Sequence, residues 1–165
     1  MAGQVKPIPE GYHTATPYLV VHDAAKAIDL YKQAFDATEI HRMATPNGKI
    51  GHAELKIGDS VIMLADEMPG TSNRSPKALG GTTASIFLYV KDVDASFQKA
   101  VAAGLKVEAP LADQFWGDRF GKLTDPFGHS WAMATHKEDV APQEMQKRAQ
   151  AAMAKMAAER SQTAG

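Results

Sequence analysis

A histidine and a glutamate stand two positions apart in a segment that alternates between apolar and polar residues. His52 and Glu54 therefore share one face of a predicted strand, with their side chains about 7 Å apart. Such a pair can bind a polar ligand group together, or act as a base and its orienting partner. In the third interpretation, the two side chains satisfy each other beside a hairpin.

Two further residues offer binding chemistry in the second half of the chain. We expect Arg119 on the same side of the sheet as His52, where its guanidinium could hold a carboxylate or phosphate with two hydrogen bonds. An ion pair inside the protein, for example with Glu54, would use it equally well. Trp116 precedes a glycine turn and offers a stacking surface for a planar ligand, or it packs on the C-terminal tail.

The elements that would position these residues occur twice in the sequence. The segment 16–23 returns 69 positions later as the segment 85–92. The same offset relates later matches: Leu19/Leu88, Val21/Val90, Ala34/Ala103, Glu39/Glu108, Gly48/Gly117 and Ala65/Ala134. Repetition at a fixed spacing predicts two copies of one supersecondary unit inside a single domain, residues 1–165.

Each copy has the predicted order β-α-β-β-β. Asp23 and Asp92 follow the first strands as helix N-caps, and Asn-Gly at 47–48 is a hairpin signal. We therefore expect an α+β fold in which two tandem βαβββ units form a curved mixed sheet around a cavity. The expected parts are a first unit at 12–66, a turn-rich linker at 67–84, a second unit at 85–136 and a methionine-striped C-terminal helix at 139–160.

Alternation along the strands assigns a face to each side chain, because helices cover the more apolar face of a sheet. The opposite face is mixed, aromatic and partly polar, which is typical of a small-molecule pocket. The alternative is a solvated or dimer-facing sheet surface. The predicted ligand-binding residues, including the stacking tryptophan, are Tyr18, His52, Glu54, Met63, Phe87, Trp116 and Arg119.

Composition excludes several classes of partner and site. The formal net charge is -1, which gives no general attraction to nucleic acid or to an anionic membrane. No stretch is long and apolar enough for a membrane span, and the chain starts without the apolar core of a signal peptide, so we expect a cytoplasmic protein. The absence of cysteine leaves only histidine and carboxylate as strong metal ligands.

Three segments carry a family resemblance: Gly51-His-Ala-Glu-Leu55, Phe115-Trp-Gly-Asp-Arg119 and Asp125-Pro-Phe-Gly-His-Ser-Trp131. Together with the paired units they resemble the vicinal oxygen chelate superfamily, which includes glyoxalase I, bleomycin resistance proteins and extradiol dioxygenases, and within it the PhnB-like branch. The resemblance implies metal ligands on the first and last strand of each unit. Those positions fall on Thr16, Met63, Ser85 and Ala132, none of which is a good divalent ligand.

The sequence therefore favours a metal-independent protein that binds and sequesters an aromatic or amphipathic small molecule, without a cofactor and as a homodimer. The alternative is a lyase, isomerase or dioxygenase of the same superfamily that uses His52 and Glu54, with or without a recruited divalent metal. A third class is a dimeric structural module in which the conspicuous residues only pack.

Overall fold

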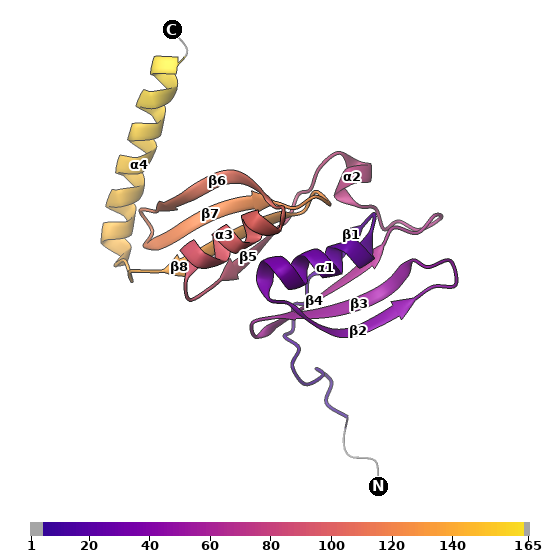
Figure 1. Cartoon of the computed structure of the whole chain (residues 1–165). Coiled ribbons are helices and arrows are strands. Elements are labelled where there is room, and N and C mark those ends of the chain that lie inside the picture. The colour runs from indigo at the N-terminus through magenta and orange to yellow at the C-terminus, as the bar shows by residue number, and fades with distance from the viewer. Residues whose placement is uncertain (1–4, 164–165) are drawn as a thin grey trace.

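The computed structural model describes residues 5–163, and it confirms the α+β architecture of two tandem βαβββ units with a C-terminal helix (Figure 1). The first unit consists of β1 (Tyr18–Val21), α1 (Ala24–Phe35), β2 (Thr38–Ala44), β3 (Ile50–Ile57) and β4 (Ser60–Asp66). The second unit and the flanking helices are α2 (Pro76–Leu79), β5 (Ser85–Tyr89), α3 (Val93–Ala103), β6 (Lys106–Asp113), β7 (Asp118–Thr124), β8 (Ser130–His136) and α4 (Pro142–Thr163). The predicted linker thus contains a short helix.

The strands form two four-stranded mixed sheets, with the orders β1-β4-β3-β2 and β5-β8-β7-β6. The first strand of each unit lies parallel to the last, and the other pairs are antiparallel. Asp23 and Asp92 cap the two helices as expected, with side chains that accept from the backbone N–H of Lys26 and Ala95. Each capped helix covers one face of its own sheet, so the opposite face, called here the outer face, is left uncovered by helices.

The two units contact each other through α1, α3 and the turn before β8 (Figure 1). Asp125 in that turn is buried, and it accepts hydrogen bonds from the Tyr31 hydroxyl at 2.7 Å and the Trp131 indole at 2.8 Å. Burial and the neighbouring Asp125 raise the pKa of the Tyr31 phenol, which therefore stays protonated as a donor. His129 contacts the Val20 carbonyl oxygen at 3.0 Å. The turn thus joins the units, and its histidine takes part in this contact.

The offset of 69 holds for β1 and β5 and for β4 and β8, but it fails for most of β3 and β7. Ala53 lies opposite Leu64, and Gly121 lies opposite Met133, the counterpart of Leu64. Gly121 therefore corresponds to Ala53, which is 68 positions earlier. A one-residue slip of this kind moves every side chain of a strand to the other face.

The extra residue in β3 is Gly51. Ile50 and His52 pair with the consecutive residues Ala44 and Met43 of β2, so Gly51 forms a β-bulge between them. From His52 onward the side chains of β3 alternate regularly between the two faces. In β7 the consecutive residues Arg119 and Phe120 pair with Asp113 and Ala112, so this strand has no extra residue at the matching position. The equivalents of His52 and Glu54 are consequently Phe120 and Lys122, not Gly121 and Leu123.

The C-terminal helix α4 begins at Pro142 and projects away from the second unit (Figure 1). Arg148 joins it to the preceding segment through an ion pair with Glu138, and it also pairs with Glu144 one turn earlier in α4. Met153 and Met156 are exposed, so these two residues of the predicted methionine stripe do not pack on the body of the molecule. Within residues 5–163, no helix is both long enough and apolar enough to cross a membrane.

Candidate functional site

Four of the residues predicted from sequence meet on the outer face of the first unit. Tyr18 on β1 lies opposite Met63 on β4, and Met63 lies opposite Glu54 on β3. His52 is two residues before Glu54 on the same strand, so its side chain joins this row. The strand pairing therefore positions one tyrosine, one methionine, one histidine and one glutamate side by side.

A chain of hydrogen bonds links these side chains to the N-terminal arm. His52 Nε2 lies 3.0 Å from Glu54 Oε1, and its Nδ1 lies 3.4 Å from the Tyr18 hydroxyl. The hydroxyl of Tyr12, a residue of the arm, donates to Glu54 Oε2. Tyr12 was missed in the sequence, because the arm has no period that would predict where its side chains lie.

The electrostatics of this chain follow from its hydrogen bonds. Donation from Tyr12 and then from His52 lowers the pKa of the Glu54 carboxyl below its usual value. The same bond to Glu54 raises the pKa of the Tyr12 phenol. The His52 and Glu54 side chains are 23% and 17% exposed, so the pair is partly shielded and satisfies itself, as one of the three interpretations expected.

The outer face of the second unit carries aromatic rings instead. Phe87 lies 4.9 Å from Tyr89 and 5.7 Å from Phe120, measured between ring centroids. Trp116 continues the series at 5.8 Å from Phe120. Phe115 packs edge-on against Trp116 at 5.1 Å. Phe87 and Trp116 were predicted from sequence as ligand-binding residues, whereas Phe120 was not among them.

A buried aspartate closes this series into a ring. Asp118 accepts hydrogen bonds from the Tyr89 hydroxyl and the Trp116 indole, both at 3.0 Å, and it contacts His136 Nδ1 at 2.7 Å. Burial of the Asp118 carboxyl acts to raise its pKa, but the hydrogen bonds from His136, Tyr89 and Trp116 outweigh burial and lower it. We call Phe87, Tyr89, Trp116, Asp118 and Phe120 the aromatic platform.

Arg119 does not belong to the outer face, which corrects the expectation from sequence. Its guanidinium binds both carboxylate oxygens of Asp94 on α3, each at 2.7 Å, and reaches Asp113 at 3.3 Å. The neighbouring Gly121 also faces α3, since an added Cβ would lie 2.6 Å from the Phe97 ring. The predicted ion pair with Glu54 is therefore replaced by an ion pair that attaches α3 to its own sheet.

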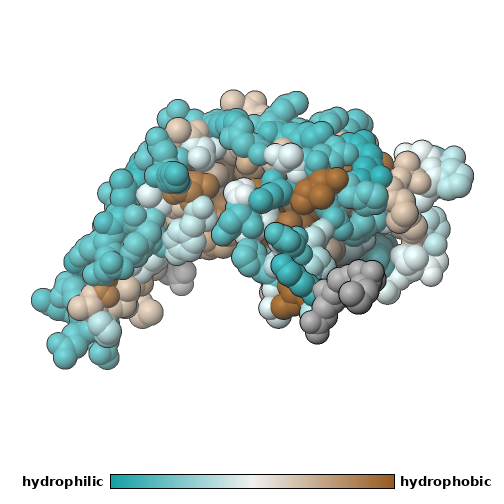
Figure 2. All heavy atoms as spheres, turned by 90° about the horizontal axis from the view of Figure 1, so that it is seen from below, coloured by the Kyte–Doolittle hydropathy of each residue, from teal (hydrophilic) through white to brown (hydrophobic). Residues whose placement is uncertain are grey.

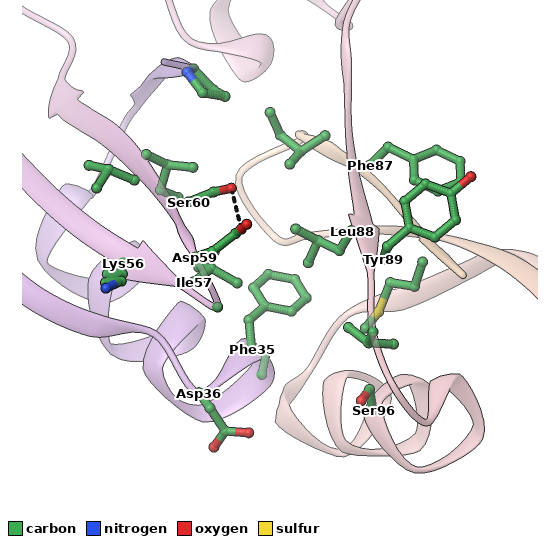
Figure 3. Close-up of a pocket in the computed structure, with 18 of the residues that line it drawn as sticks. Phe35, Asp36, Lys56, Ile57, Asp59, Ser60, Phe87, Leu88, Tyr89 and Ser96 are labelled. Carbon is green, nitrogen blue, oxygen red and sulfur yellow. Dashed lines mark hydrogen bonds between the residues drawn. The ribbon is translucent and has the colours of Figure 1, made fainter. Parts of the chain in front are cut away.

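A groove of about 1090 Å³ lies between the two units, and Figure 2 shows the surface hollowed there. Its apolar lining includes Phe35, Ile57 and Leu88. In Figure 3, Leu88 points from β5 toward Phe35, whereas Phe87 and Tyr89 lie on the opposite side of β5. Of the residues predicted to bind ligand, only Phe87 lines this groove.

The residues present do not fit the divalent metal that the superfamily resemblance implies. Met63 and Ala132 occupy equivalent positions on β4 and β8 and carry no metal-binding oxygen or nitrogen in their side chains. His52 and Glu54 supply two donors, and the His41 ring lies 6.4 Å from that of His52. Across residues 5–163, no three His, Cys, Asp or Glu side chains gather closely enough to hold a metal ion.

The fold and these motifs place the chain in a known family. Residues 12–133 match the model of the Glyoxalase/Bleomycin resistance protein/Dioxygenase superfamily, so the chain belongs to that superfamily, as its motifs predicted. An uncharacterized protein of Mycobacterium bovis is 48% identical over 134 residues, covering 79% of this chain and 88% of the relative. An uncharacterized protein of Arabidopsis thaliana is 35% identical over 121 residues, covering 67% and 70%.

Solved structures agree with this assignment. The crystal structure of TioX from Micromonospora sp. ML1 superposes with a TM-score of 0.60 at 28% identity, covering 74% of this chain and 98% of that one. A PhnB protein from Bacillus cereus, described as a putative 3-demethylubiquinone-9 3-methyltransferase, has a TM-score of 0.56 at 19% identity, with coverage of 74% and 99%. At that identity the second likeness supports the fold alone.

Proposed function

We propose that this protein is a metal-independent binding protein that sequesters a planar aromatic small molecule. The single observation that carries the proposal is the aromatic platform, where Phe87 and Tyr89 stay largely exposed although their rings are in contact with each other. Exposed aromatic side chains that gather on one sheet face form an apolar surface for ring stacking, with a few polar atoms to orient the ligand.

Binding of three planar dyes tests this proposal. Proflavine, riboflavin and anilinonaphthalene sulfonate offer flat ring systems of positive, neutral and negative charge. We expect at least one of them to bind the purified protein with a dissociation constant below about 1 mM, measured by the fluorescence anisotropy of the dye. The proposal is abandoned if none of the three binds, or if binding requires an added divalent metal.

Two variants on neighbouring residues of β5 locate the binding surface. Phe87→Ala removes a platform ring, whereas Leu88→Ala changes the opposite side of the same strand (Figure 3). Loss of one stacking ring should weaken dye binding about five- to twenty-fold. Leu88→Ala serves as the matched control and should leave the affinity within about two-fold. The reverse order of effects would place the ligand in the groove between the units.

A second candidate function is metal-free proton transfer, which the contacts of His52 favour. An imidazole held by a carboxylate on one nitrogen and by a tyrosine on the other is oriented as a base would be. Deuterium exchange at the carbon beside the carbonyl of hydroxyacetone, followed by NMR with a chelator present, tests this activity. The candidate requires exchange above the buffer rate that is lost in His52→Gln, and equal rates in both proteins would reject it.

The binding protein is further proposed to act as a homodimer. β1 and β2 in the first unit, and β5 and β6 in the second, each pair with a single strand in the described residues 5–163, so each unit has two free strand edges. A second copy could cover these edges and the apolar groove between the units. Light scattering on the eluted protein should give twice the chain mass, and a monomer at micromolar concentration would reject this part of the proposal.

A further inference from the structure

Two buried carboxylates in this protein bind the same kinds of partner. Asp125 and Asp118 each accept one hydrogen bond from a tyrosine hydroxyl and one from a tryptophan indole, and each is 4% exposed. The partners of Asp125, Tyr31 and Trp131, are fully buried. Without Asp125, folding would remove the Tyr31 hydroxyl and the Trp131 indole N–H from water and leave them without a partner in the core. The need to satisfy these buried donors is enough to explain Asp125.

Folding does not explain Asp118 in the same way. Its partner Tyr89 is 65% exposed, and Trp116 is only half-buried. Water could satisfy the hydroxyl and the indole N–H of these side chains, so the protein gains little stability by fixing them. The carboxylate nevertheless holds both rings at set positions beside Phe87 and Phe120.

The position of Asp118 is itself fixed by the residues around it. His136 bonds to Asp118 through Nδ1 and to Asp139 through Nε2 at 3.0 Å, so both ring nitrogens are engaged. The preceding Gly117 carbonyl oxygen accepts two backbone hydrogen bonds from the segment after β8, at 2.9 and 3.0 Å. The carboxylate is thus held by both the backbone and a side chain.

We propose that Asp118 is a positioning residue of the ligand site, which holds Tyr89 and Trp116 in the orientation that the bound ring system requires. This inference rests on the proposed binding function. Side chains that are already ordered lose no conformational freedom when a ligand arrives, so preorganisation increases affinity without any contact between Asp118 and the ligand.

The test compares Asp118→Leu with Asp125→Asn, using the dye that binds best to the wild-type protein. Leucine is close to aspartate in size but accepts no hydrogen bond, so it removes the bonds to all three partners of Asp118. We expect Asp118→Leu to weaken dye binding about ten-fold, because two rings lose their anchor. Asp125→Asn should lower the unfolding temperature more, yet bind the dye within about two-fold of wild type below that temperature.

A readout without ligand separates this inference from the proposed function. The chain has two tryptophans, and Trp131 is fully buried, so acrylamide quenching of the native protein reports mainly on Trp116. Quenching should rise in Asp118→Leu and stay unchanged in Asp125→Asn. If no dye binds to the wild-type protein, the proposed function fails, while the quenching result still decides whether Asp118 positions Trp116.

A milder variant guards against misfolding of Asp118→Leu. Tyr89→Phe removes one hydroxyl and keeps the ring, and it should weaken dye binding about two- to five-fold with little change in unfolding temperature. The inference is overturned if Asp118→Leu and Tyr89→Phe both bind the dye as wild type does. It is also overturned if the two aspartate variants lose affinity in proportion to their loss of stability.

Discussion

The outer faces of the two units have the same strand order but different chemistry. In the first unit, Glu54 and His52 form a hydrogen-bonded chain with two tyrosines. In the second unit, the equivalents of these residues are Lys122 and Phe120, and the face is built from aromatic rings around one buried aspartate. Duplication thus supplied one scaffold twice, and substitution at matching positions gave each copy its own surface.

The comparison shows that shape and chemistry are separable in this fold. The helix-covered faces of both sheets are apolar and buried, because they must form the core. The outer faces are free of that constraint and have diverged. We expect the difference between the two units to appear in stability, in ligand binding and in pH dependence.

The largest expected difference between the units is the loss of unfolding free energy when a turn glycine is replaced by alanine. An alanine at Gly117 would overlap the carbonyl oxygen of Glu138 and would also be strained by the positive φ of 98°. We expect Gly117→Ala to cost about 2–4 kcal/mol in unfolding free energy. Gly48→Ala has a φ of 80° but open space, so it should cost about 1 kcal/mol. Urea unfolding measures both, and equal costs would mean that the contact with Glu138 is unimportant.

Ligand binding should depend on the second face alone. Phe120→Ala removes a platform ring that contacts both Phe87 and Trp116, and it should weaken dye binding about five- to ten-fold. His52→Ala changes the equivalent position of the first unit and should leave dye affinity within about two-fold. Titration of each variant by anisotropy gives the result. A larger loss in His52→Ala would mean that the first face holds the ligand.

The two faces should respond to pH in opposite directions. The pKa of Glu54 is lowered in the folded protein, so its contribution to stability is present above the unfolded value of about 4.3 and is lost as the pH falls through the folded value. Hydrogen bonds to Asp118 and Asp139 raise the pKa of His136. Its contribution is therefore present below about pH 6.5 and is lost as the pH rises through the folded value.

Unfolding temperatures across the pH range check these signs. The difference between wild type and Glu54→Gln should shrink at acid pH, and the difference between wild type and His136→Gln should shrink at alkaline pH. If both differences shrink at the same end of the pH range, one of the two hydrogen-bond networks is not formed in solution.

Substitution of Arg119 should have the smallest effect on stability and on dye binding. Its ion pair with Asp94 lies near the surface of the helix-covered side, where such pairs contribute little. Arg119→Gln should lower the unfolding temperature slightly and leave dye affinity unchanged. Weaker dye binding would indicate that the guanidinium reaches the ligand after all.

Much of the fold could be predicted from the sequence, because local patterns specify it. The aspartate N-caps, the Asn-Gly turn and the repeated strand segment indicated the element order, and the motif around Asp125 indicated the family. The face of β7 could not be predicted in this way. A single bulge at Gly51 shifts the repeat by one residue, and an ungapped comparison has no signal for it.

Local sequence patterns specify the two βαβββ units, the residue types at the four positions where the family resemblance implies metal ligands, and several outer-face residues. Which polar groups meet depends on the tertiary structure. It brought Tyr12 from the arm to Glu54, and it brought Asp118 to one ring on β5 and to another in the turn before β7. The physical reason is that strand patterns are periodic and readable over a few residues, whereas hydrogen bonds between side chains depend on register and approach across distant segments.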